Sequence, residues 1–458
     1  MRILAALVVI EALGYAVVRA VARIGYRPGR IESLALAWVF GMGLTSLGMG
    51  ALNALGLTLD RQVAGLTLFA GLLAGGWIAG RTRRAGGAPW VGRFPRLFRA
   101  PRESAQWGAG RALVWLLLAM LSLQVALVAV TQAGQPLHVW DSWVTWAMKA
   151  RAIFLDGRIS PAVYDDPSRA VTHLDYPLLV PLIEAWLYQW VGAADDRMAG
   201  IAVVCSYVAL ILIGFAVMRR RGSTTLVALA AAAVIACMRL VAGMAGEGLA
   251  DIPMSLLAAV AALYLSGWLN SGSAGELAIA VIAGGLMPWT KREGWVLLLA
   301  LAAAAVFAAR GNRRARIAAV GLALGAVALS GPWWAFISTQ GIANTDFLPL
   351  SWSAGQANAG RIFFVIWTEL QSMMSGDWNF VWPLTALLAV ALVAMKVPVE
   401  PAARLLPLAA LIYLALMSLT YVFSAYVPYQ QHVLTSSYRL MAHVAPLMVV
   451  WVAGWTAP

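Results

Sequence analysis

Charge is scarce in this sequence. Only 12% of its 458 residues are Asp, Glu, Lys or Arg, whereas 62% are hydrophobic, and the mean hydropathy is +0.78. Its apolar runs recur and are long enough to cross a bilayer, which takes about 20 helical residues. Because these runs are continuous, they lack the short alternating segments of a membrane barrel. The sequence therefore predicts an all-α, polytopic membrane protein.

Cysteine is nearly absent as well. The two residues, Cys205 and Cys237, both fall inside apolar runs and show no paired spacing. This excludes a disulfide framework and a thiolate metal site, and we expect both side chains to be packing residues. The sequence contains no convincing internal repeat either.

Acidic residues are outnumbered, with 20 Asp and Glu against 33 Lys and Arg and a formal charge of +13. Such an excess can indicate a nucleic-acid partner, but here the cations cluster between apolar runs. The clusters lie near residues 19–30, 81–111, 219–221, 310–316 and 396–404. By the positive-inside rule all five face the cytoplasm, so we predict no nucleic-acid partner.

The number of apolar runs that cross the membrane must leave all five basic clusters on the same side. They lie near residues 3–22, 33–57, 61–80, 111–131, 176–193, 197–218, 223–243, 249–269, 276–290, 294–309, 316–337, 379–396, 404–425 and 438–457. Three of them separate the second and third clusters, where the number of crossings must be even. We expect that the run 176–193 does not cross the membrane, because Pro177, Pro181 and Glu184 interrupt it. About 13 transmembrane helices remain, with the N-terminus outside and the C-terminus inside.

The longest outer segment under this topology, residues 132–175, contains the stretch PLHVWDSWVTWAMKARAIF, with Asp141 among three tryptophans. If it is one helix, three- and four-residue spacing predicts a single apolar stripe of Trp140, Trp143, Ala147, Ala150 and Phe154. Such a helix lies in the membrane interface, where tryptophan is favoured. Asp141 would project from another face.

More charges fall on the same predicted face. They are His173 and Asp175 at the end of the outer loop, Glu247 and Asp251 at the start of a span, Lys291 and Arg292 in a turn, Arg439 at the end of the last span, and His443 one turn deeper. Each has a structural alternative: Asp251 as a helix cap, the 291–293 turn as an exposed loop, and Arg439 as a snorkelling side chain. Their common depth, where phosphate headgroups sit, favours a shared site.

The order of these motifs resembles the GT-C superfamily of integral-membrane glycosyltransferases, particularly bacterial relatives of protein mannosyltransferases and of the lipid A aminoarabinose transferase. The matching elements are Asp141 in the first large outer loop, HLDYPLL from His173, Asp251 at the start of a span, the turn WTKREG, and SYRLMAHVAP near the last span. The resemblance covers roughly residues 111–458. It implies a GT-C-like transmembrane catalytic core there and an added three-span unit with a basic linker at residues 1–110. That linker is either solvated or held on anionic headgroups.

Two departures from the family pattern affect the expected site. The first loop of the family often carries two adjacent acids, whereas Ser142 follows Asp141 here, so Asp175 or Asp251 would supply the second acid. A large extramembrane C-terminal domain is also absent from the sequence given. The oligosaccharyltransferase branch, which needs such a domain and a divalent metal, is therefore disfavoured, and we expect no metal or cofactor.

The resemblance and the residue chemistry imply one mechanism, transfer of a sugar from a polyprenyl phosphate with inversion at the anomeric carbon. Lys291, Arg292 and Arg439 would hold the phosphate, and Asp141 would take the proton of the acceptor hydroxyl. The other candidate substrate-binding residues are Trp143, Lys149, His173, Glu247 and His443.

The expected partners follow from that mechanism. They are a polyprenyl-phosphate-sugar donor, a glycan or glycolipid acceptor and membrane lipids, at the outer face of a bacterial inner membrane. The sequence names neither sugar nor acceptor, nor the oligomeric state. A polytopic transporter or flippase for a lipid-linked or anionic substrate is the alternative, and a non-catalytic export partner is a third, although it would not need the set of acids and cations.

Overall fold

The computed structural model describes residues 1–84, 109–164 and 166–455. Within these ranges the chain forms helices and no strand, apart from an isolated bridge between Phe347 and Ser424. This confirms the predicted all-α class. Most of the predicted basic linker, and Asp165, lie outside the described residues.

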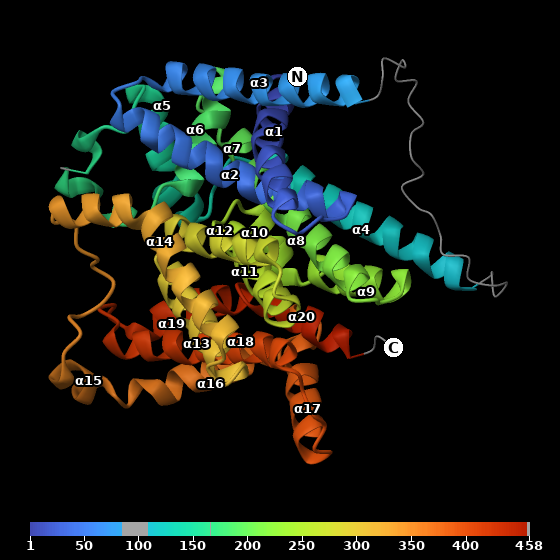
Figure 1. The fold of residues 1–458 in the computed structure, drawn as a ribbon. Coiled ribbons are helices and arrows are strands. Elements are labelled where there is room, and N and C mark those ends of the chain that lie inside the picture. The colour runs from blue at the N-terminus through green and yellow to red at the C-terminus, as the bar shows by residue number, and fades with distance from the viewer. Residues whose placement is uncertain (85–108, 165, 456–458) are drawn as a thin grey trace.

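The first half of the chain builds one side of the molecule (Figure 1). Its elements are α1 (Arg2–Arg23), α2 (Arg30–Ala54), α3 (Leu59–Arg84), α4 (Ala109–Gly134), the π-helix η1 (Asp141–Ala147), α5 (Met148–Asp156), the 3₁₀ turns η2 (Pro161–Val163) and η3 (Pro167–Thr172), α6 (Leu179–Val191), α7 (Asp196–Ala199), α8 (Ile201–Arg220), α9 (Thr225–Ala236) and α10 (Arg239–Gly246). Side-chain caps at Asp195 and Thr224 begin α7 and α9. Left-handed glycines at 157 and 192 follow the last residues of α5 and α6.

The second half packs beneath it in the same view. Its elements are α11 (Asp251–Ser271), α12 (Ala274–Thr290), α13 (Glu293–Ala308), α14 (Arg313–Thr339), α15 (Trp352–Asn358), α16 (Arg361–Met373), η4 (Gly376–Trp378), α17 (Val381–Ala394), α18 (Pro401–Thr420), η5 (Tyr421–Phe423), α19 (Tyr429–Ala442) and α20 (Ala445–Gly454). Helix α11 is buried along almost its whole length and contacts α8, α12 and α18. Residues 340–351, which we call the strap, run between α14 and α15 along one edge of the molecule (Figure 1).

Seven of the described helices are long and apolar enough to cross a membrane, or nine if each of two bent pairs, α9–α10 and α19–α20, forms one span. Helices α12, α13 and α17 are apolar but shorter. The polytopic class is therefore confirmed, whereas the number of about 13 crossings stays a prediction. Helix α6, which falls in the run excepted from crossing, has 13 residues and is largely buried in protein.

Charged groups lie at both ends of α11. At its first residue, Asp251 binds Lys291 and Arg439. Near its last residues, Ser266 accepts a hydrogen bond from Arg221, and Arg314 donates to the backbone of Leu269 and Asn270. Since α11 has 21 residues, these ends lie roughly 30 Å apart along the helix. Arg404 lies in the first turn of α18, close to Ala402, whose carbonyl oxygen accepts a hydrogen bond from Ser266. Three of the basic clusters predicted to share one face, those of Arg221, Arg314 and Arg404, thus gather at the end away from Asp251.

The end of α11 away from Asp251 also fastens the first helices to the rest. Glu32 in α2 accepts hydrogen bonds from Tyr26, Tyr264 and Arg220, and the Arg220 guanidinium lies over both tyrosine rings. Helix α2 packs further against α6 and α8. The predicted unit 1–110 is therefore joined to the core by buried contacts, and its separate role stays a prediction.

Helices α1 and α2 approach each other so closely that glycine is required. A Cβ atom on Gly41 would lie 2.1 Å from the carbonyl oxygen of Ile10, whereas one on Gly50, in the same helix, would have no heavy atom within 4 Å. We expect Gly41→Ala to destabilise the fold by about 1–3 kcal/mol through overpacking.

The matched variant Gly50→Ala should be neutral or stabilise by up to about 1 kcal/mol through helix propensity. Thermal unfolding of both variants in detergent tests this difference. Equal midpoints for the two variants would contradict the close helix contact.

Candidate functional site

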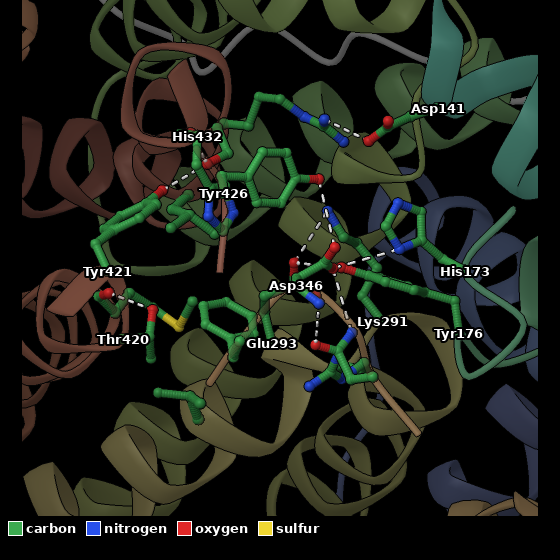
Figure 2. A pocket seen from close by; sticks show the side chains of 18 of the residues that line it. Asp141, His173, Tyr176, Lys291, Glu293, Asp346, Thr420, Tyr421, Tyr426 and His432 are labelled. Carbon is green, nitrogen blue, oxygen red and sulfur yellow. Dashed lines mark hydrogen bonds and ion pairs between the residues drawn. The ribbon is translucent and has the colours of Figure 1, made fainter. Parts of the chain in front are cut away.

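A cavity of about 800 Å³ opens at the end of α11 that begins with Asp251. Its wall combines η1, the residues before α6, the turn between α12 and α13, the strap, the end of α18 with η5, and α19. The charged and polar side chains that line it include Asp141, Thr145, His173, Lys291, Arg292, Glu293, Asn344, Asp346, Gln431, His432 and Arg439. Figure 2 shows ten lining residues by label, with acids and bases facing one another across the space.

The floor of this cavity is held by Asp251, whose side chain is fully buried. One of its oxygens accepts from Lys291 Nζ at 2.8 Å and lies 3.0 Å from His443 Nε2. The other accepts from Arg439 Nη2 at 2.7 Å and Nε at 3.1 Å. Because the carboxylate is saturated and does not line the cavity, Asp251 orients two cations and cannot itself remove a substrate proton there.

The turn that presents Lys291 is very tight. Only Lys291 and Arg292 separate α12 from α13, and the two helices contact each other. A Cβ atom on Gly294 would lie 2.3 Å from the Met287 backbone, which makes glycine necessary at that position. Lys291 is almost completely buried yet still lines the cavity. Its ammonium group is therefore fixed at the cavity floor and partly shielded from water.

Asp141 lines the cavity and forms an ion pair with Arg439 through one carboxylate oxygen. It begins the π-helix η1, whose hydrogen bonds join residues i and i+5 rather than i+4. The predicted apolar stripe is therefore wrong: Trp140 and Trp143 are exposed, whereas Ala147 and Ala150 are buried. Asp141 and Thr145, which are four residues apart, both line the cavity.

A second charged group, formed around the strap, lies beside the first. Arg292 Nη1 binds Asp175 Oδ2 at 2.9 Å, and Asn344 Nδ2 donates to Asp175 at 3.3 Å and to Asp346 at 3.2 Å. Asp346 also pairs with His173 Nδ1 at 3.3 Å. The strap is thereby fastened to the loop that precedes α6.

Burial and neighbouring charges shift the proton affinities of this second group. Burial raises the pKa of Asp175 above its ordinary value, although Arg292 and Lys149 oppose it. Burial also raises the pKa of Asp346, but the hydrogen bond and charge of His173 lower it more, and its net pKa lies below the ordinary value. Asp346 is thus held in its charged form, which is the form that orients an imidazole.

Several residues predicted to bind substrate lie away from the cavity wall. Trp143 is 46% exposed on the outer surface, and it is Trp140 and Trp146 that line the cavity. Glu247 follows α10 and His443 lies behind Asp251, where Tyr413 also binds its ring. Like Asp175, these side chains do not line the cavity, so any effect they have on a ligand there passes through other residues.

Lys149 was predicted to bind substrate, but its side chain is buried and turned into the protein. Its ammonium group donates to the carbonyl oxygens of His173 at 2.6 Å and Tyr176 at 3.0 Å. Burial lowers the pKa of Lys149 to about 7, against the opposing charge of Asp175. Lys149 therefore fastens its helix to the 173–176 turn and does not face a ligand.

The polar cavity residues that the sequence did not predict include Asn344, Asp346, Tyr426 and His432. The same parity that puts Asp141 on the outer side also puts there the segment between the runs near 316–337 and 379–396, which carries the first two, and the segment between the runs near 404–425 and 438–457, which carries the others. Tyr426 stacks on His432 with ring centroids 4.3 Å apart and donates to Asp346 at 3.3 Å.

Comparison with known proteins gives the same fold as the sequence motifs. No family model and no curated protein matches the chain. The structure is similar to the crystal structure of ArnT from Cupriavidus metallidurans in the apo state, with a TM-score of 0.50 and 14% sequence identity. ArnT is the lipid A aminoarabinose transferase, a GT-C enzyme. The chain has a GT-C-like fold.

The GT-C-like match covers 76% of this chain and 60% of ArnT, so the chain spans well under the full length of that enzyme. At this identity the match describes the architecture. Activity, donor and acceptor must be argued from the cavity itself.

Because of the buried charges at the cavity floor, we expect replacement of Asp251 to lower stability far more than replacement of Asp377. Asp251→Ala would leave Lys291 and Arg439 buried without their shared partner, which we expect to cost about 3–5 kcal/mol. Asp377→Ala removes an ion pair to Arg239, whose side chain is 79% exposed, and should change stability little.

Apparent melting temperatures of the two aspartate variants in the same detergent check this prediction. A loss for Asp251→Ala no larger than that for Asp377→Ala would contradict the view that Asp251 holds the floor together.

Proposed function

We propose that this protein is an inverting glycosyltransferase that moves a sugar from a polyprenyl phosphate to an acceptor hydroxyl at the outer face of the membrane. The observation that supports it most is the convergence of Lys291 and Arg439 on the cavity floor beside the carboxylate of Asp141. This combines fixed cations for a phosphate with a group able to receive a proton. The GT-C-like fold is consistent with this proposal.

The cations act on the leaving group. A sugar joined to a polyprenyl phosphate leaves as a phosphate, so catalysis requires charge neutralisation on its oxygens rather than an acid. Lys291 and Arg439 are already placed by Asp251, and their attraction grows as negative charge develops. Arg292, 27% exposed and paired with Asp175, is a third cation at the same turn.

The apolar part of the wall suits the lipid. Trp295 and Val296 from α13, Trp334 from α14, and Met417 and Leu440 line the cavity together with the charged residues. A polyprenyl chain would lie along these side chains while its phosphate meets the cations. A donor that is part lipid and part anion therefore matches both halves of the wall.

Asp141 would remove the acceptor proton as the hydroxyl attacks the anomeric carbon. The new carbon–oxygen bond forms opposite the breaking bond to phosphate, whose electron pair goes to the phosphate oxygen, and the configuration inverts. In the structure Asp141 is paired with Arg439. Because the donor phosphate competes for the same guanidinium, donor binding would release the carboxylate for its role as base.

The cavity wall also indicates the class of the acceptor. We propose a glycan or glycolipid acceptor and a place in cell-envelope synthesis at the outer face of a bacterial inner membrane. The ten or so aromatic side chains around the acids and amides of the cavity support a sugar-containing acceptor, because sugar rings pack on aromatic faces while their hydroxyls bind carboxylates.

Mutation of the cations should weaken donor binding, whereas mutation of Asp141 should slow sugar transfer. Loss of a charge-assisted hydrogen bond is worth about 1.5–3 kcal/mol, so Lys291→Met should weaken the binding of decaprenyl phosphate roughly 10- to 100-fold. Asp141→Asn removes a competitor for Arg439 and should bind that lipid at least as tightly as the wild type, while sugar transfer falls about 100-fold or more.

Lipid-binding titrations and transfer assays on the purified variants separate the two roles. Arg151→Met is the control, because Arg151 pairs with Asp196 outside the cavity and should leave both measurements unchanged. An active Asp141→Asn protein would refute its assignment as base, and unchanged lipid binding by Lys291→Met would refute the phosphate site.

Transfer should not depend on a divalent metal. Among the described residues no group of three or more His, Cys, Asp or Glu side chains could hold a metal ion, and the cations already present balance a phosphate. We expect the rate to survive dialysis against EDTA. Loss of transfer that magnesium or manganese restores would instead identify Asp141 as a metal ligand.

A further inference from the structure

His173 and Asp346 form a pair on the cavity wall that the proposed reaction has not yet used. His173 Nδ1 lies 3.3 Å from Asp346 Oδ2. The carboxylate of Asp346 is held in turn by Asn344 Nδ2 at 3.2 Å and by the Tyr426 hydroxyl at 3.3 Å. Figure 2 shows the imidazole on the same side of the cavity as Asp141, with its second nitrogen turned away from Asp346.

The position of the imidazole is fixed from the backbone outward. His173 has a φ of 50°, a left-handed conformation that a residue with a side chain adopts rarely and that its surroundings must maintain. Lys149 Nζ binds its carbonyl oxygen at 2.6 Å, and the ring packs edge-on against Tyr176 with centroids 5.6 Å apart. Buried contacts thus hold this ring in place.

A carboxylate on one imidazole nitrogen decides the chemistry of the other. Asp346 favours the tautomer with its proton on Nδ1, so Nε2 carries the lone pair. Among the described residues Nε2 has no hydrogen-bond partner, although His173 lines the cavity. The arrangement is that of a general base oriented by an acid.

Asp141 is poorly suited to keep a proton, because a protonated carboxyl could not re-form its ion pair with Arg439 once the donor phosphate has left. We propose that His173, oriented by Asp346, is the group that receives the acceptor's proton from Asp141 and passes it out of the reacting centre. This inference rests on the proposed glycosyl transfer and adds a second catalytic residue to it.

The proton balance of the step is simple. The acceptor oxygen bonds to the anomeric carbon while the carbon–oxygen bond to phosphate breaks, and the hydroxyl proton moves to the Asp141 carboxylate. It then moves, across the cavity water, to His173 Nε2, which regenerates the carboxylate. The imidazolium later releases the proton to water at the cavity mouth. No oxidant, reductant or co-reactant is required.

The charges around His173 favour this proton transfer. The titratable and charged groups near it are Asp346, Asp175, Asp141, His432, Lys149, Arg292 and Tyr176. Burial lowers the pKa of His173, but the hydrogen bond and charge of Asp346, followed by the charges of Asp175 and Asp141, raise it more, so its net pKa lies above the ordinary value. A neutral His173 can therefore accept a proton, and activity should rise with pH through this raised pKa.

The test uses the full-length protein in detergent and a panel of synthetic decaprenyl-phosphate monosaccharides, with release of decaprenyl phosphate as the readout. His173→Gln keeps a hydrogen-bonding side chain that cannot take up a proton. It should lower kcat roughly 100-fold, abolish the acidic limb of the pH profile that belongs to the histidine, and leave decaprenyl phosphate binding unchanged.

The variant Asp346→Asn provides a second measurement, a shift of the pH profile whose direction can be predicted. Removing the neighbouring carboxylate lowers the pKa of His173, so the acidic limb should move to lower pH by about one to three units. Because His173 is retained, a purely structural role would not predict this shift. His138→Gln, an exposed outer-loop histidine away from the cavity, should match the wild type in every measurement.

The outcomes separate this inference from the function on which it rests. A wild-type rate and pH profile for His173→Gln, or an unmoved acidic limb for Asp346→Asn, would overturn the role of the pair while leaving glycosyl transfer standing. A wild-type protein that turned over no donor of the panel and did not bind decaprenyl phosphate would overturn both.

Discussion

The buried carboxylate of Asp251 is the interaction on which the rest of the site depends. It binds Lys291 from the α12–α13 turn and Arg439 from α19, and it contacts His443 at the bend between α19 and α20. None of these charges would be stable alone in so dry a place, because the penalty for leaving water is recovered only when acid and bases remain together. The requirement that they pair therefore fixes where three separate parts of the chain meet.

The two ends of α11 use similar chemistry for different purposes. At one end, Glu32 and Arg220 satisfy each other and two tyrosine hydroxyls, in a closed group that joins α2, α8 and α11. At the other end the cations exceed what Asp251 can neutralise, and Arg439 reaches into a cavity to meet Asp141. Cations that face a cavity can exchange a carboxylate partner for a bound anion, whereas a closed group can only hold helices together.

Irregular backbone places the reactive side chains. The π-helix turns Asp141 toward Arg439, a two-residue turn presents Lys291, and a left-handed backbone at His173 holds its imidazole beside Asp346. Regular helices surround each of these places, and beside Lys291 the backbones of α12 and α13 approach so closely that position 294 must be glycine. Departures from regular geometry at such sites are sustained by the rigid packing around them.

The sequence by itself determined the membrane class, the clustering of arginine away from the site, and the residues Asp141, Lys291 and Arg439, because hydropathy and charge are properties of composition and order. It failed where geometry intervened. The regular helix assumed for residues 140–154 gave the wrong stripe, and Lys149 and Trp143 do not line the cavity. The loop that carries Asp346 was not expected to reach it. Only the tertiary structure decided which charge meets which, because ion pairs such as Asp141 with Arg439 join residues some 300 positions apart. Their partners are selected by burial and packing, which local sequence patterns do not contain.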